Sequence, residues 1–96
     1  MVKFIENLSW RTHAQDFKEG EQKILLALSN EDYLWRSFDR LTAVTRLDKK
    51  ALAESLDGLM TKGVVRPSIS SESKEPIYGL VERVGPGNRA AQQMRM

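Results

Sequence analysis

Residues 38–66 constrain the fold of this chain more than any other segment. Their clearest pattern is an apolar stripe that recurs at i, i+1, i+4, i+7 and i+8: Leu52, Ala53, Leu56, Leu59 and Met60. This spacing places the five side chains on one helix face that is wide enough to cover a core. Asp48 is a typical N-cap residue, and Gly63 is typical of the position just past a helix end. We therefore predict a helix between Asp48 and Gly63 with one buried side.

A shorter helix precedes this one across a tight turn. It is predicted over residues 38–46, with Ser37 as its cap. Its inner face carries three apolar residues: Phe38, Leu41 and Val44. Residues 45–47 form the turn. Two amphipathic helices joined this closely pack together, and one flank of the second helix then stays open for binding.

Strands are predicted on both sides of the helix pair. Residues 64–69 and 76–84 predict a hairpin, with the polar residues 70–75 as its loop. Residues 33–36 predict a short strand, whose aromatic members we expect at the core edge: Tyr33 and Trp35. The predicted order is therefore helix, strand, helix, helix, strand and strand.

The N-terminal part is less regular. A capping box at residues 16–19 predicts a helix whose firm part begins near Glu21, because Gly20 weakens its first turns. Residues 1–15 fit neither a helical nor a strand period, so they form either a segment that packs on the domain or a partner, or a partly ordered leader. If exposed, Trp10 would mark a protein contact. We divide the chain into an N-terminal segment, a domain over residues 16–85 and a flexible tail over residues 86–96.

Composition excludes several classes of function. The chain has 96 residues, enough for one small domain, and it has no cysteine, which removes disulfides and thiolate zinc sites. His13 is the only histidine, and no nucleophile elbow or glycine-rich phosphate loop is present, so we expect no catalytic site, metal or cofactor and no enzyme. No apolar run reaches membrane-spanning length, which favours a cytoplasmic protein without a membrane partner.

The residues of the helix pair and of the following strand resemble the winged helix-turn-helix superfamily. The resemblance rests on one set of positions: Leu41, Thr45, Leu47, Asp48, Leu52, Leu56, Leu59, Lys62, Gly63, Val64 and Val65. It implies an α+β fold with a three-helix core, a short strand and a C-terminal β-hairpin wing. A narrower likeness, carried by Tyr33, Trp35, Arg36 and Ser37, is to small bacterial winged-helix modules with a Tyr-x-Trp-Arg-Thr/Ser signature. That likeness implies a bacterial regulatory or accessory protein.

Winged helices bind DNA, RNA and proteins, so the fold leaves the partner open. Our first hypothesis is a transcriptional regulator or accessory module that binds double-stranded DNA as a homodimer, because pairing compensates for few contacts per copy. The third helix would lie in the major groove, with phosphate contacts beside it. The candidate DNA-binding residues are Arg36, Ser37, Arg40, Thr45, Arg46, Lys49, Lys50, Ser55, Arg66 and Lys74.

The charge pattern keeps a second hypothesis open. Residues 48–63 hold three cations and three anions, whereas a dedicated DNA reader concentrates Lys and Arg there. A projection at 100° per residue turns six of these residues away from the core: Lys50, Ala51, Glu54, Asp57, Gly58 and Thr61. The wing loop has one cation and two anions, which favours a solvated hairpin tip. The alternative is a protein-interaction adaptor that does not bind DNA.

Overall fold

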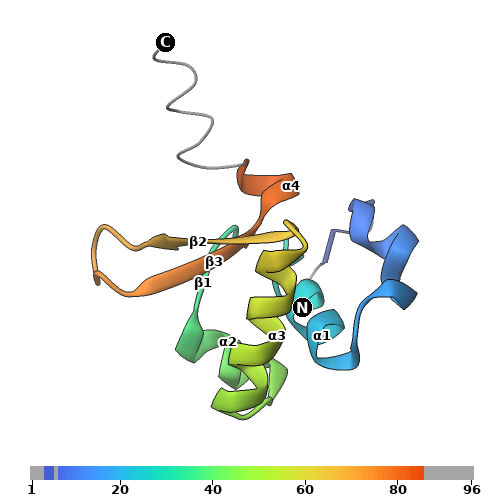
Figure 1. Ribbon diagram of the computed structural model, residues 1–96. Coiled ribbons are helices and arrows are strands. Elements are labelled where there is room, and N and C mark those ends of the chain that lie inside the picture. Colours follow the sequence, from blue (N-terminus) through green and yellow to red (C-terminus); the bar gives the residue numbers. More distant parts are fainter. Residues whose placement is uncertain (1–3, 6, 86–96) are drawn as a thin grey trace.

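The computed structural model describes residues 4–5 and 7–85. After a 3-10 helix η1 (Ser9–Asp16), the elements are α1 (Glu19–Ala27), β1 (Arg36–Ser37), α2 (Phe38–Thr45), α3 (Lys49–Thr61), β2 (Val65–Ile69), β3 (Pro76–Leu80) and α4 (Val81–Val84). The three strands form one antiparallel sheet in the order β1-β3-β2. In Figure 1, helices α1, α2 and α3 lie below this sheet, and the β2–β3 hairpin projects beyond them. The predicted tail at residues 86–96 lies outside the described residues.

The core lies between the helices and the sheet. Leu52, Leu56 and Leu59 of α3 are buried, as the apolar stripe predicted. They pack with one cluster of buried side chains drawn from the rest of the chain: Leu8, Trp10, Ile24, Leu25, Leu28, Leu41, Val65 and Leu80. Burial of apolar surface is the main stabilising term of such a small domain. The stripe is narrower than predicted, because Ala53 is exposed and Met60 is half-buried.

Local hydrogen bonds fix the ends of the helix pair where the sequence placed them. Ser37 Oγ accepts the Arg40 N–H at 3.1 Å, and Asp48 Oδ1 accepts the Ala51 N–H at 2.7 Å. Between the helices, Arg46 adopts the left-handed conformation with φ of 63°. Gly63, with φ of 76°, follows the last turn of α3 and directs the chain into β2, a conformation that glycine adopts without steric cost.

Five local predictions were wrong. Helix α1 begins at Glu19 with Lys18 as N-cap, because Glu21 Oε1 accepts the Lys18 N–H at 2.9 Å while Asp16 ends η1. The short strand is Arg36–Ser37, and the Tyr33 side chain is 53% exposed rather than at the core edge. Val44 is also exposed, because α2 contacts its neighbours through Leu41 and Thr45. Finally, β3 ends at Leu80, where the chain turns into α4.

The N-terminal segment packs on the helices. Trp10 is 8% exposed, and its Nε1 donates to the buried Ser29 Oγ at 2.9 Å. The Ile5 N–H donates to Ser29 O at 2.8 Å, and Phe4 pairs with Asn30 in an antiparallel bridge. Trp10 is therefore a core residue rather than an exposed protein contact. The boundary between residues 15 and 16 stays a prediction.

The short helix α4 connects two distant parts of the chain. Glu82 accepts hydrogen bonds from the Ser9 N–H and, at 2.6 Å, from Ser9 Oγ. Arg83 Nη1 lies within hydrogen-bond distance of three carbonyl oxygens in the loop after α1, those of Leu28, Asn30 and Tyr33. These contacts explain why the chain leaves the sheet after Leu80. The side chains of α4 form hydrogen bonds with η1 and with the loop after α1, and not with a neighbouring strand.

Candidate nucleic-acid interface

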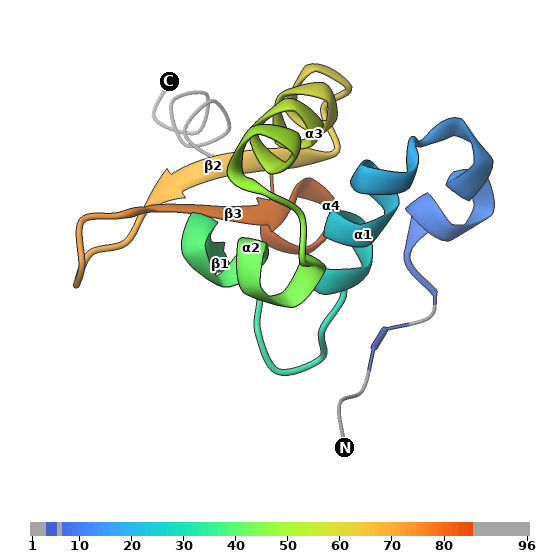
Figure 2. The ribbon, with the colours of Figure 1, turned by 90° about the horizontal axis from the view of Figure 1, so that it is seen from below.

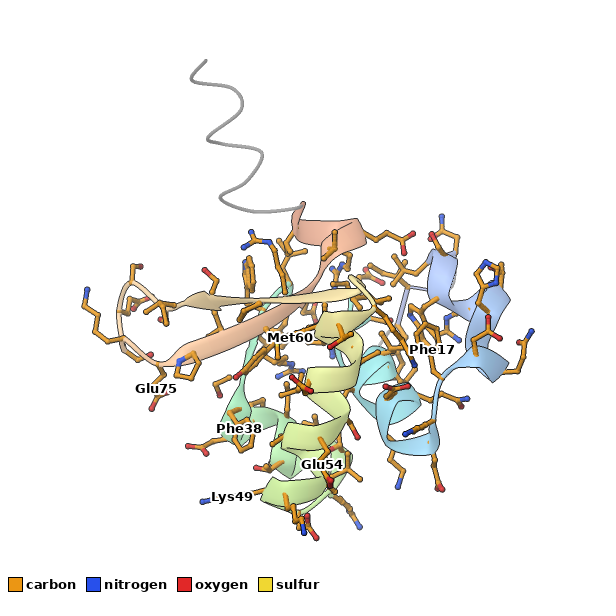
Figure 3. All side chains as sticks on the ribbon, in the orientation of Figure 1. Phe17, Phe38, Lys49, Glu54, Met60 and Glu75 are labelled. Atoms are coloured by element: carbon orange, nitrogen blue, oxygen red, sulfur yellow. The ribbon has the colours of Figure 1, made fainter. Side chains whose placement is uncertain are left out.

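The exposed flank of α3 carries charges of both signs. Lys49, Lys50, Glu54 and Asp57 are all exposed, and α3 has no further charged residue before Lys62. Figure 3 shows Lys49 at the start of the helix and Glu54 farther along it. The helical projection had placed Ala51 and Gly58 on this exposed flank. In the structure both residues are half-buried, because they lie where α3 faces α1. The open surface of α3 is therefore cationic only in its first turn.

Four cations at the helix-turn-helix have no ion-pair partner among residues 4–5 and 7–85: Arg40, Arg46, Lys49 and Lys50. We call this set the basic end. Its members lie on α2, on the turn and on the first turn of α3, and all are exposed. The only carboxylate at the start of α3, that of Asp48, is engaged by the Ala51 N–H. Free cations beside a helix N-terminus, whose dipole is positive, attract anions.

The other candidate residues on the helices and strands make internal contacts. Thr45 is buried, and its Oγ1 donates to Leu41 O at 2.6 Å. Arg66 Nε donates to Gly85 O at 2.7 Å, and its guanidinium lies 4.8 Å from the centre of the Trp35 ring. Ser37 caps α2, and Ser55 is half-buried in the cleft between α1 and α3. These contacts orient the side chains toward the protein itself.

Arg36 is half-buried rather than open to solvent. Its guanidinium lies 4.3 Å from the centre of the Tyr33 ring. Burial lowers the pKa of Arg36, the charge of Arg40 lowers it further, and Tyr33 partly offsets both. An arginine nevertheless remains charged under physiological conditions. Arg36 therefore contributes positive potential near the basic end without being one of its exposed members.

The wing consists of β2, β3 and the loop of residues 70–75 between them. Its tip is closed by two backbone hydrogen bonds, Ser70 N–H to Glu75 O and Lys74 N–H to Ser70 O, both 2.9 Å long. Lys74 has a positive φ of 64°, and it is exposed together with Glu72 and Glu75. Figure 3 shows Glu75 at the wing, away from α3. The tip therefore offers a single cation beside two anions.

Two further features limit the chemistry available to the described residues. No three histidine, aspartate or glutamate side chains there gather as metal ligands would. None of the helices in the described ranges is both long and apolar enough to span a bilayer. Sequence reasoning missed the internal roles of Arg36 and Arg66. The partners of Arg66, which are Trp35 and Gly85, lie far from it in the sequence. The partner of Arg36 is Tyr33, three residues before it, and this spacing was the signal that could have been used.

Comparison with solved structures identifies one similar fold. The chain is similar to a MarR-family transcriptional regulator from Silicibacter pomeroyi, with a TM-score of 0.62 and 20% sequence identity. The match covers 90% of this chain and 57% of that one, so this chain spans just over half the length of the regulator. No protein-family model matches the sequence, and no curated protein matches it either. The Tyr-x-Trp-Arg-Ser likeness thus stays a prediction. The chain has an α+β winged helix-turn-helix fold, with a three-helix core and a C-terminal β-hairpin wing.

Proposed function

We propose that this protein is a winged-helix regulator that binds duplex DNA through the basic end and the wing. The observation that carries the proposal is the exposure of four cations around the helix-turn-helix, none of which forms an ion pair within the described part of the chain: Arg40, Arg46, Lys49 and Lys50. The likeness in fold to a transcriptional regulator supports it. A bacterial, cytoplasmic setting belongs to the same proposal.

Binding of this kind depends mainly on phosphate contacts. The four cations would neutralise phosphates beside the major groove, and Lys74 would add one contact from the wing. Glu54 and Asp57 face the same surface and oppose the phosphates, although a glutamate can accept a hydrogen bond from cytosine N4. Each copy therefore binds weakly, and two copies on adjacent half-sites would compensate.

The test is a fluorescence-anisotropy titration of a labelled duplex at several salt concentrations. About five phosphate contacts per copy predict a slope of log K against log salt of roughly −4 to −5 for each bound copy. The double variant Lys49→Ala/Lys50→Ala should reduce the magnitude of this slope by about 2 for each bound copy. The matched control is Lys18→Ala/Lys23→Ala, which removes the same charge from α1 and its cap. An affinity that does not change with salt, or an equal loss in the control, would contradict the proposal.

A protein-interaction module that does not bind DNA is the second candidate function. It is favoured by the balance of charges on α3, where Lys49 and Lys50 are offset by Glu54 and Asp57. Affinity capture from the native lysate, with and without nuclease, separates the two functions. Partners lost after nuclease treatment support DNA binding, whereas partners retained after it support the interaction module.

A further inference from the structure

A groove between α1 and α2 is distinct from the proposed DNA surface. Its volume is about 340 Å³, at the lower end of the range for binding pockets. Its lining comes from the N-terminal segment, α1, the loop after it, β1 and α2: Phe4, Lys23, Leu26, Ala27, Asn30, Arg36, Val44 and Thr45. None of these residues belongs to α3 or to the wing. In Figure 2, α3 lies on one side of α1 and α2, and the loop after α1 lies on the other.

Three large apolar side chains remain exposed along this groove. Phe4 is 38% exposed, Leu26 is 39% exposed and Val44 is 44% exposed. They come from three segments that are far apart in the sequence, and the fold brings them to one place. Single exposed apolar residues are ordinary, but a contiguous group that lines a groove is typical of an interaction site.

Among the described residues, the charged side chains that line the groove are both cationic. They are Lys23 and Arg36, and no carboxylate of residues 4–5 and 7–85 lines it. Lys23 is only weakly compensated, because its nearest acid, Glu19, is 3.9 Å away with 89% of its side chain exposed. Arg36 Nε is buried and has no hydrogen-bond partner among the described residues. This nitrogen is closed to solvent, so Arg36 presents the charge of its guanidinium, rather than Nε itself, to an occupant of the groove.

We propose that this groove binds a short acidic and apolar segment of a partner protein. Apolar side chains of that segment would contact Phe4, Leu26 and Val44, and its carboxylate would accept a hydrogen bond from Arg36. A groove between two helices suits an amphipathic helix with anchors at i and i+3 or i+4. A second copy of this chain fits less well, because a twofold contact would bring two Lys23 and two Arg36 side chains into one interface, with no carboxylate of the described part of the chain lining it. The inference goes beyond DNA binding and does not depend on it.

The experiment begins with the full chain and a display library of short random peptides, in the absence of DNA. Enriched sequences should combine large apolar residues at helical spacing with Asp or Glu. One enriched peptide is then synthesised and labelled, and its affinity is measured by anisotropy. Leu26→Glu and Lys23→Glu should each weaken binding by about tenfold, since one removes an apolar anchor and both add a negative charge. Arg36→Gln should weaken it by at least as much.

The matched control is Leu34→Glu, which changes an exposed leucine outside the groove and should leave the affinity unchanged. Because Arg36 is half-buried, circular dichroism must show that Arg36→Gln folds; Leu26→Glu and Lys23→Glu decide the question if it does not. Three results would overturn the proposal. They are the absence of peptide enrichment, equal loss in Leu34→Glu, and a dimer that Leu26→Glu converts to monomer, which would assign the groove to a second copy.

Discussion

Lys62 Nζ lies 2.8 Å from Glu21 Oε1, and this ion pair joins the end of α3 to the first turn of α1. The same carboxylate oxygen accepts the Lys18 N–H at 2.9 Å. The Glu21 side chain is only 4% exposed, whereas that of Lys62 is 40% exposed. The pair thus holds α1 and α3 together at the edge of the core. Gly58 of α3 lies close to the same Glu21 side chain.

Glu21→Gln should reduce the free energy of unfolding by about 2 kcal/mol at neutral pH, because hydrogen bonds to a charged group are replaced by weaker ones. Burial alone would raise the pKa of Glu21, but the hydrogen bonds and charges of Lys62 and Lys18 lower it below 4.5 overall. The unfolded chain therefore binds the proton first as the pH falls. The stabilisation is complete above pH 4.5 and is lost as the pH falls through the lower folded-state value.

Urea unfolding of both proteins over a pH series measures this effect. The difference in stability between wild type and Glu21→Gln should shrink as the pH is lowered below 4.5. Glu19→Gln, on the exposed side of the same helix turn, is the control and should change stability little. A difference that stays constant across the series would contradict the role assigned to the charged form of Glu21.

Gly58→Ala should destabilise the protein although it removes a glycine from a helix interior. The substitution ordinarily stabilises a helix by about 1 kcal/mol. Here the added Cβ would overlap Glu21 Oε2, and the Glu21 side chain is held in place by Lys62 and the Lys18 N–H. In a Glu21→Ala background the overlap is absent, so Gly58→Ala should then stabilise. A double-mutant cycle should give a coupling free energy of about 2 kcal/mol, and additive effects would contradict the prediction.

Removing the N-terminal segment should expose part of the core. Trp10→Ala is expected to cost about 3 kcal/mol, because a buried indole and its hydrogen bond to Ser29 Oγ are lost. Leu34→Ala, which shortens an exposed side chain, should cost little.

A fragment of residues 16–96 tests the predicted domain boundary directly, and it should unfold at a lower urea concentration than the full chain. Equal midpoints would mean that residues 1–15 are dispensable for folding.

Glu54→Gln should raise the affinity for duplex DNA by about threefold at low salt, because it removes a negative charge from the exposed flank of α3. Glu19→Gln makes the same change on α1 and should have little effect. Anisotropy titrations of the three proteins with one duplex provide the comparison. A loss of affinity in Glu54→Gln would contradict this prediction and would point to a hydrogen bond from Glu54 to a base.

Local sequence signals were sufficient for most of the fold. The caps at Ser37 and Asp48, the stripe of leucines in α3 and the exit at Gly63 were all predicted, because each depends on residues within a few positions of one another. Some of the predictions failed because a distant contact decided the outcome. The end of β3 is one example, since Arg83 reaches carbonyl oxygens of residues 28–33 that no local pattern connects with it.

The candidate sites divide in the same way. The amino-acid order was enough to predict cations on both sides of the turn and an amphipathic α3, because helical period requires no knowledge of distant residues. Packing then set which cations stay exposed, since Arg66 contacts Trp35 and Gly85 from distant parts of the chain. It also decided that Phe4, Leu26 and Val44 share one groove. Burial and pairing depend on chain segments that packing brings together, whereas helix caps and apolar stripes depend on residues a few positions apart in the chain.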